Sequence, residues 1–135
     1  MRPWLASAGA VAAGFLVTAI ASTAADAAMH GLRIFPDSVR AMSDPLFALA
    51  SAYRALFTIA GGYVTARLAP DRPMRHAWVL AGIGLAAGLA GVVAYYAMAE
   101  GELGPAWYAM SIPLEAVPCV WFGARLAAPR RPALA

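Results

Sequence analysis

The chain has 135 residues, of which 62% are hydrophobic and only 13% are charged, whereas an ordinary soluble domain has about 25% charged residues. A soluble fold this small has too much surface for its volume to bury so many apolar side chains. The net charge of +3 is too small to suggest a nucleic-acid partner, and the single cysteine, Cys119, excludes an internal disulfide and a multi-cysteine metal site. No metal and no cofactor are therefore expected.

Long apolar blocks predict membrane-spanning helices. Each block is longer than the roughly 20 residues that a helix needs to cross about 30 Å of hydrocarbon. None of the blocks alternates in hydrophobicity as the strands of a barrel would. We therefore predict an all-α fold, a four-helix transmembrane bundle with short loops that forms one domain over residues 1–135. The predicted spans cover residues 4–29, 45–69, 77–99 and 105–127.

Arginines are distributed unevenly between the two sides of this bundle. Arg33 and Arg40 lie in the loop between the first two spans, close to Asp37 and Asp44. Because basic residues collect on the cytoplasmic side, we expect both termini and the loop between the second and third spans to be cytoplasmic. The arginines on that side are Arg2, Arg67, Arg72, Arg75, Arg125, Arg130 and Arg131.

The first span has an alternative interpretation as a cleaved secretory signal. An arginine precedes its apolar stretch, and Ala25-Asp26-Ala27 is similar to the small-residue pattern of a cleavage site. The apolar stretch is longer than the roughly 7–15 residues of such signals. A retained span is therefore the preferred interpretation.

Two opposite charges lie deep inside the predicted spans. Arg54 is nine residues into the second span, and Glu115 is ten residues into the fourth. At about 1.5 Å of rise per residue, both lie roughly 13–15 Å deep, close to the middle of the bilayer. Since a lone charge there costs on the order of 3 kcal/mol, we predict an Arg54–Glu115 ion pair. Asp26, near the outer end of the first span, has three possible partners: Arg54, His30 or water.

Polar residues follow helical spacing in three of the predicted spans. Residues three or four apart share one face of a helix, so these residues are expected to form stripes that face inward around the ion pair. Packing between helices is the preferred interpretation of such stripes, and a hydrated pathway is the alternative. The stripe residues are Thr18, Ser22 and Asp26 in the first span, Ser51 and Thr58 in the second, and Ser111 and Cys119 in the fourth.

The third predicted span has no charge and carries regularly spaced glycines. Gly84, Gly88 and Gly91 belong to small-residue faces that let two helices approach closely. We expect this span to contact another helix, either within the bundle or in a second copy or a larger membrane protein. Gly82-Ile-Gly84 does not indicate a dinucleotide-binding loop, because no strand precedes it.

Four short motifs carry a resemblance to known proteins. They are Gly61-Gly-Tyr63, Ala66-Arg-Leu-Ala-Pro70, Arg72-Pro-Met-Arg-His76 and Pro105-Ala-Trp-Tyr108. Residues 53–124, about half of the chain, resemble a group of small uncharacterised four-span proteins of the bacterial inner membrane. The resemblance implies four spans in that membrane, and it implies no activity and no site residue.

Two functions fit these features. The first is a non-enzymatic accessory or interaction subunit of the inner membrane, locked by Arg54 and Glu115. The alternative is a small transporter or channel component in which Glu115 takes up and releases a proton or a cation. An enzyme is not expected, because the sequence offers no set of nucleophile, base and metal ligands. The expected partners are the lipid bilayer and another membrane protein or a second copy.

Overall fold

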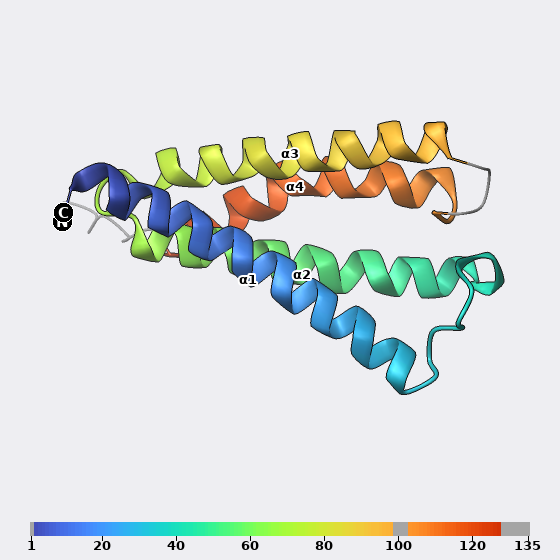
Figure 1. Ribbon diagram of the computed structural model, residues 1–135. Helices are drawn as coiled ribbons and strands as arrows, with labels where there is room; N and C mark the ends of the chain where they lie inside the picture. The colour runs from blue at the N-terminus through green and yellow to red at the C-terminus, as the bar shows by residue number, and fades with distance from the viewer. Residues whose placement is uncertain (1, 99–102, 128–135) are drawn as a thin grey trace, which may run out of the picture.

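The part of the chain that the structure describes folds into α-helices joined by short connections. The computed structural model describes residues 2–98 and 103–127. Its helices are α1 (Pro3–Gly31), α2 (Asp44–Leu68), α3 (Pro73–Ala97) and α4 (Ala106–Ala127), with a short 3₁₀ turn, η1 (Val39–Ala41), between α1 and α2. The predicted all-α class with four long helices is confirmed (Figure 1).

Proline marks the start of three helices. Pro3 and Pro73 are the first helical residues of α1 and α3, and Pro45 is the second of α2. The missing N–H of proline is tolerated there, because the first turn of a helix has no partner for it. Helix α3 therefore begins at Pro73 rather than at the predicted residue 77. Arg72, directly before it, has a φ of 38°, which closes the tight α2–α3 turn.

Helix α2 is the most widely connected helix of the bundle. It packs against α4 and α1, while α3 packs mainly against α4 and touches α1 only weakly. In Figure 1, α1 crosses α2 and then diverges from the other helices towards its C-terminal end. The beginning of α1, the α2–α3 turn and the end of α4 lie together at one end of the bundle. Helix α1 therefore depends on α2 for most of its contacts.

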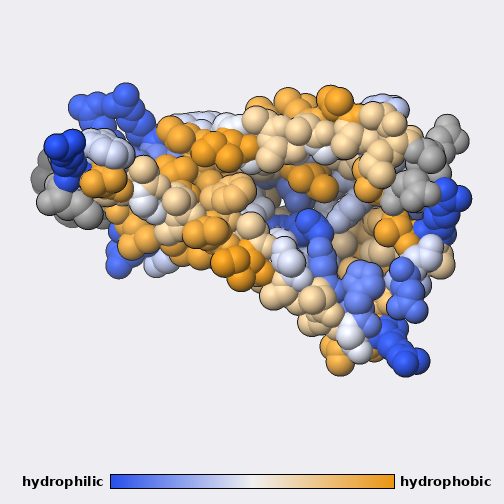
Figure 2. Space-filling model, viewed as in Figure 1, coloured by the Kyte–Doolittle hydropathy of each residue, from blue (hydrophilic) through white to orange (hydrophobic). Residues whose placement is uncertain are grey.

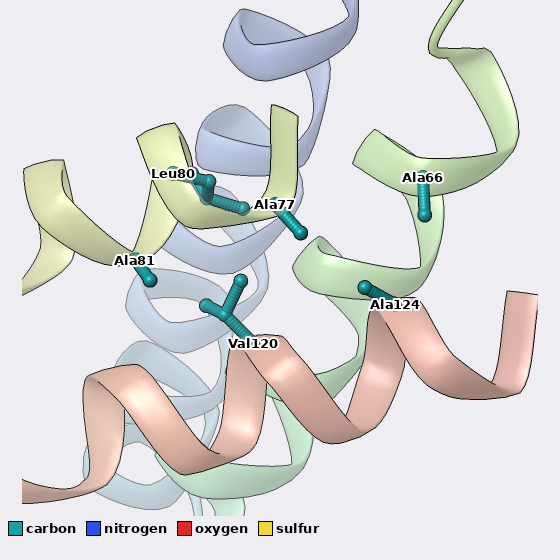
Figure 3. Close-up of a cluster of buried hydrophobic side chains, with 6 residues drawn as sticks. All are labelled: Ala66, Ala77, Leu80, Ala81, Val120 and Ala124. Atoms are coloured by element: carbon teal, nitrogen blue, oxygen red, sulfur yellow. The ribbon is translucent and has the colours of Figure 1, made fainter. Parts of the chain in front are cut away.

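Small side chains form the core where α2, α3 and α4 meet. Figure 3 shows these side chains gathered between the three helices. Because alanine has only a β carbon, the helices approach closely, as is usual in bundles rich in small residues. The cluster consists of Ala66 from α2, Ala77, Leu80 and Ala81 from α3, and Val120 and Ala124 from α4.

Glycine and threonine form a reciprocal contact where α1 crosses α2. A Cβ atom added at Gly14 would collide with the side chain of Thr65 and the carbonyl of Gly61. A Cβ atom added at Gly61 would collide in the same way with Thr18 and the carbonyl of Gly14. Thr18 also donates to the carbonyl of Phe57 across the crossing, at 3.2 Å. The two backbones are so close here that only glycine fits without a shift.

The glycines of α3 meet different surroundings. A Cβ atom added at Gly88 would lie 2.8 Å from the Cα atom of Pro113 on α4, and one added at Gly84 would lie 3.4 Å from the Cβ atom of Ala116. A Cβ atom added at Gly91 would meet no atom within 4 Å. Gly84 and Gly88 therefore contact a helix of the same chain, whereas Gly91 faces open space.

Large apolar side chains point outward on every helix, and much of the molecular surface is apolar (Figure 2). By length and composition, α1 and α3 are apolar enough to cross a membrane. Helices α2 and α4 do not reach the same apolarity, so two of the four predicted spans meet this criterion. Strongly exposed examples, one on each helix, are Ile20 (63%), Leu56 (63%), Val93 (69%) and Leu114 (74%).

The contact between α3 and α4 predicts that Gly88→Ala destabilises the bundle while Gly82→Ala does not. An alanine methyl group at position 88 would press on the backbone of Pro113, and overpacking of this kind costs about 1–3 kcal/mol. Gly82 is the matched control, because a Cβ atom added there would meet nothing within 4 Å. Thermal unfolding of the detergent-solubilised protein, followed by circular dichroism, measures both variants. A wild-type melting temperature for Gly88→Ala would contradict this packing.

Candidate functional site

Two side chains of α2 hold the carboxylate of Asp26 on α1. Arg54 donates from Nη2 to Oδ2, and the hydroxyl group of Tyr53 donates to Oδ1. The side chains of the ion pair are 29% exposed for Arg54 and 32% exposed for Asp26, so the pair is mostly shielded by the surrounding helices. Each carboxylate oxygen has a donor of its own. The contact ties the C-terminal part of α1 to α2.

This pairing differs from the predicted Arg54–Glu115 pair. Within the described residues, Arg54 forms its ion pair with Asp26, which was one of three partners considered for that carboxylate. The ring Nδ1 of His30 lies 2.8 Å from the backbone carbonyl oxygen of Asp26, so His30 contacts the backbone of Asp26 near the end of α1 and not its carboxylate. Helix α1 continues to Gly31, which places Asp26 more than one turn inside the helix. Depth along a helix does not report which neighbour a side chain faces, and Asp26 faces α2.

Glu115 on α4 accepts a hydrogen bond from α2. The Oγ atom of Ser51 donates to Oε2 of Glu115 at 3.2 Å and lies 3.1 Å from Oγ of Ser111. Ser111 donates in turn to the carbonyl of Tyr108 at 2.8 Å. Ser51 and Arg54 are three residues apart, so they share one face of α2. That face therefore supplies a donor to each of the two carboxylates.

The remaining stripe residues either donate hydrogen bonds to backbone carbonyls or pack between the helices. Thr18 and Thr58 each donate to the carbonyl one turn earlier in their own helix, at 3.1 Å and 2.8 Å. Ser22 is buried. Cys119 is a half-buried free thiol, one turn beyond Glu115. These positions support the fold of the site, and the threonine hydroxyls do not bond to the charged groups.

A crevice of about 550 Å³, lined by all four helices, lies between α1 and α3. Figure 2 looks onto this hollow, in which hydrophilic atoms lie between apolar walls. The predicted site residues that line it are Thr18, Ser22, Arg54, Thr58 and Glu115. Those that lie outside its lining are Asp26, Ser51, Ser111 and Cys119. The predicted stripes therefore meet at one crevice, with part of the polar network behind its wall.

The chemistry that this crevice offers is recognition of charge. It combines one guanidinium group, one carboxylate and several hydroxyl groups with a largely apolar wall, which is typical of a small-molecule site. Among residues 2–98 and 103–127, no group of three histidine, cysteine, aspartate or glutamate side chains is placed to hold a metal ion. The arrangement suits the binding of a charged group in apolar surroundings.

Tyr53 is a member of the polar network that the sequence pattern did not single out. Its side chain is buried, with an exposure of 8%, and its ring stacks on that of Phe35 while its hydroxyl group reaches Asp26. The available signal was its position directly before Arg54 in an apolar helix, because a buried tyrosine needs a partner for its hydroxyl group. Neither spacing nor depth identifies that partner.

Comparison with known protein families, with curated proteins and with solved structures finds no match for this chain. The described residues form four α-helices, and two of these are long and apolar enough, by length and composition, to cross a membrane. The resemblance of residues 53–124 to small proteins of the bacterial inner membrane stays a prediction.

The polar network predicts strong energetic coupling between Asp26 and Arg54. Arg54→Leu or Asp26→Leu alone leaves a partly buried charge without its partner, which costs about 1–3 kcal/mol of unfolding free energy. The double variant should recover much of that loss, so the coupling energy should exceed about 0.5 kcal/mol. Unfolding in mixed micelles with increasing fractions of dodecyl sulfate measures each free energy.

A second cycle with Arg54→Leu and Glu115→Leu is the matched control. Its coupling energy should be the smaller of the two, because Glu115 is bonded to Ser51. If the Arg54–Glu115 cycle shows the larger coupling energy, the pairing described above is wrong and the pairing predicted from depth is right.

Proposed function

We propose that the chain is an integral protein of the bacterial inner membrane that crosses the bilayer four times. The proposal is supported by the apolar exterior, which carries large exposed side chains on all four helices. Helices α2 and α4 are less apolar because they carry Arg54 and Glu115, and both groups find hydrogen-bond partners inside the bundle. Polar residues in spans normally face the bundle interior and pair there.

The arginines support an orientation with both termini in the cytoplasm. Arg2, Arg67, Arg72 and Arg125 adjoin the end of the bundle where α1 begins, α2 turns into α3 and α4 ends. Arg33 and the rest of the connection between α1 and α2 adjoin the opposite end of the bundle. Basic residues collect on the cytoplasmic side of inner-membrane proteins, so the first end is the cytoplasmic one.

Within that membrane, the chain acts as a non-enzymatic accessory or interaction subunit. The observation that carries this role is the internal pairing of Asp26 with Arg54, which locks α1 onto α2 and uses the charges structurally. A partner then contacts the outer face of α3. This face is apolar throughout, and it has small side chains at the end where α3 begins. Its exposed residues are Gly82, Ala86, Leu89 and Val93, which follow helical spacing of four, three and four residues.

A small transporter or channel component is the second candidate. The observation that favours it is the crevice between α1 and α3, because Glu115 lines this space instead of facing away from it. Intramembrane carboxylates that face a cavity often mark the path of a proton or an ion.

Labelling of single cysteines tests the topology. In a Cys119→Ser background, Ser38→Cys before η1 should react with a membrane-impermeant maleimide in intact spheroplasts, since it lies on the outer side. Asp71→Cys in the α2–α3 turn should react only after the membrane is permeabilised. Both positions are exposed, so accessibility within the fold does not limit either reaction. Equal labelling of both sites in intact spheroplasts would contradict the topology, and a purified mass below 14.0 kDa would indicate cleavage of α1.

The accessory role predicts a complex larger than the 14.0 kDa chain in gently solubilised membranes. Gly82→Leu should reduce the amount of this complex in native electrophoresis after cross-linking, because a leucine disrupts the smooth end of the α3 face. Gly91→Leu is the matched control on the same helix, since Gly91 lines the crevice. Recovery of the wild-type chain as a lone monomer would argue against the accessory role.

A further inference from the structure

The charges around the crevice do not balance. Arg54 carries +1 and forms its ion pair with Asp26, which carries −1 and lies outside the crevice lining. Glu115 lines the crevice, carries −1 when ionised and is hydrogen-bonded to the neutral Ser51. The three charges therefore sum to −1 (+1 −1 −1). In surroundings of low dielectric constant, an unbalanced charge favours the binding of a counter-ion.

The walls of the crevice combine apolar and aromatic side chains, which suit an apolar ligand that carries a positive charge. Phe15 and Leu80 contribute apolar surface, and the rings of Tyr95 and Tyr108 also line the space. Aromatic rings attract cations through the negative charge density on their faces. Helix α3 contributes glycines such as Gly91, which have no side chain, so this wall leaves space for bulky substituents of a ligand. The volume of about 550 Å³ lies within the roughly 300–1,000 Å³ of small-molecule sites.

We propose that this crevice binds a hydrophobic organic cation with a single positive charge, of the quaternary ammonium or phosphonium class, with Glu115 as its counter-ion. Such a ligand brings the summed charge from −1 to zero. Its apolar substituents occupy the space beside the small residues of α3. The site deepens the transporter candidate and rests on the membrane-embedded bundle proposed above, but it requires no partner protein.

Other ligand classes fit the same residues less well. A carboxylate bound to Arg54 would change the summed charge from −1 to −2, and a phosphate would make it more negative still. Either anion would compete with Asp26 for the guanidinium group. A hard metal cation prefers about six or more oxygen ligands. Glu115 is the one carboxylate among the residues that line the crevice, so this ligand set is too small for such a cation. A singly charged organic cation needs one counter-ion and apolar contacts, and the crevice supplies both.

The weak contact between α1 and α3 gives this ligand a route to Glu115. The crevice opens sideways between these two helices, where a four-span bundle faces lipid. A hydrophobic cation partitions into the bilayer and can enter from there. Entry at this point also passes Thr18 and Ser22 on α1, which belong to the lining of the crevice.

Binding of tetraphenylphosphonium to the purified full-length protein in a neutral maltoside detergent tests the proposal. Equilibrium dialysis against protein-free micelles corrects for partition into detergent. Tetraphenylborate, which has nearly the same size and shape and the opposite charge, is the ligand control. Wild-type protein should bind the phosphonium saturably at one site per chain, and the borate should show no saturable binding. Glu115→Gln should weaken phosphonium binding about tenfold or more.

Two further variants separate loss of the site from loss of the fold. Gly91→Leu fills the crevice without a change in charge and should also weaken binding about tenfold or more. Gly9→Leu adds the same side chain at an exposed position of α1 outside the crevice lining, and it should bind as wild type does. Circular dichroism and size-exclusion chromatography confirm that each variant is folded. If Glu115→Gln does not fold, the comparison of Gly91→Leu with Gly9→Leu still tests the site.

Four results would overturn the proposal. The first three are absence of saturable phosphonium binding to the wild type, undiminished binding by folded Glu115→Gln, and equal affinity of the phosphonium and the borate. The fourth is undiminished binding by Gly91→Leu, which would place the cation outside the crevice. None of these results bears on the topology or on the native complex, so failure of this proposal is distinguishable from failure of the proposed function.

Discussion

The position of α1 is fixed by two contacts with α2, and the form of the crevice depends on it. Near the middle of α1, Gly14 and Gly61 allow the two backbones to touch. Twelve residues later, about 18 Å along the helix, Asp26 is held by Arg54 and Tyr53. Beyond the crossing α1 diverges from the other helices, and there the ion pair acts together with an apolar cluster in which Ala25 and Met29 of α1 pack against Phe35, Ala50 and Tyr53 (Figure 1). Together the contacts set the distance between α1 and α3.

The same ion pair determines the electrostatics of the crevice. Arg54 carries a single positive charge and forms its ion pair with Asp26 on α1, so one carboxylate charge is in excess when Glu115 on α4 is ionised. Ser51, one turn away on α2, provides Glu115 with a hydrogen bond but with no opposite charge. An Arg54–Glu115 pair would have left a neutral crevice and an unpaired Asp26 near the end of α1. The observed pairing places the unbalanced negative charge at the crevice wall.

Sequence patterns predicted the helices well and the side-chain partners only in part. Apolar blocks and prolines locate helices because both signals are local in the sequence. Pro73, which favours a first helical turn, marks the start of α3, four residues before the predicted residue 77. Depth along a helix is a single coordinate, so it matched Arg54 to Glu115 without information on helix tilt or rotation. Tyr53 was missed for that reason. Gly88 was expected to contact a helix, but the identity of α4 as that helix required the packed structure.

The helices that fall short of the apolarity expected of a span are those that carry the charged groups at the crevice. Helix α2 contains Arg54 and Ser51, and α4 contains Glu115 and Ser111, which lowers the mean hydropathy of both. Each of these four side chains has a hydrogen-bond partner within the described bundle, and Arg54 and Glu115 line the crevice between the helices. The outward residues of the same helices, Leu56 and Leu114, are apolar and exposed. When a helix carries polar groups on its inner face, its mean hydropathy is lower than the hydropathy of its outer face, so an average over the whole helix understates the apolarity of that outer face.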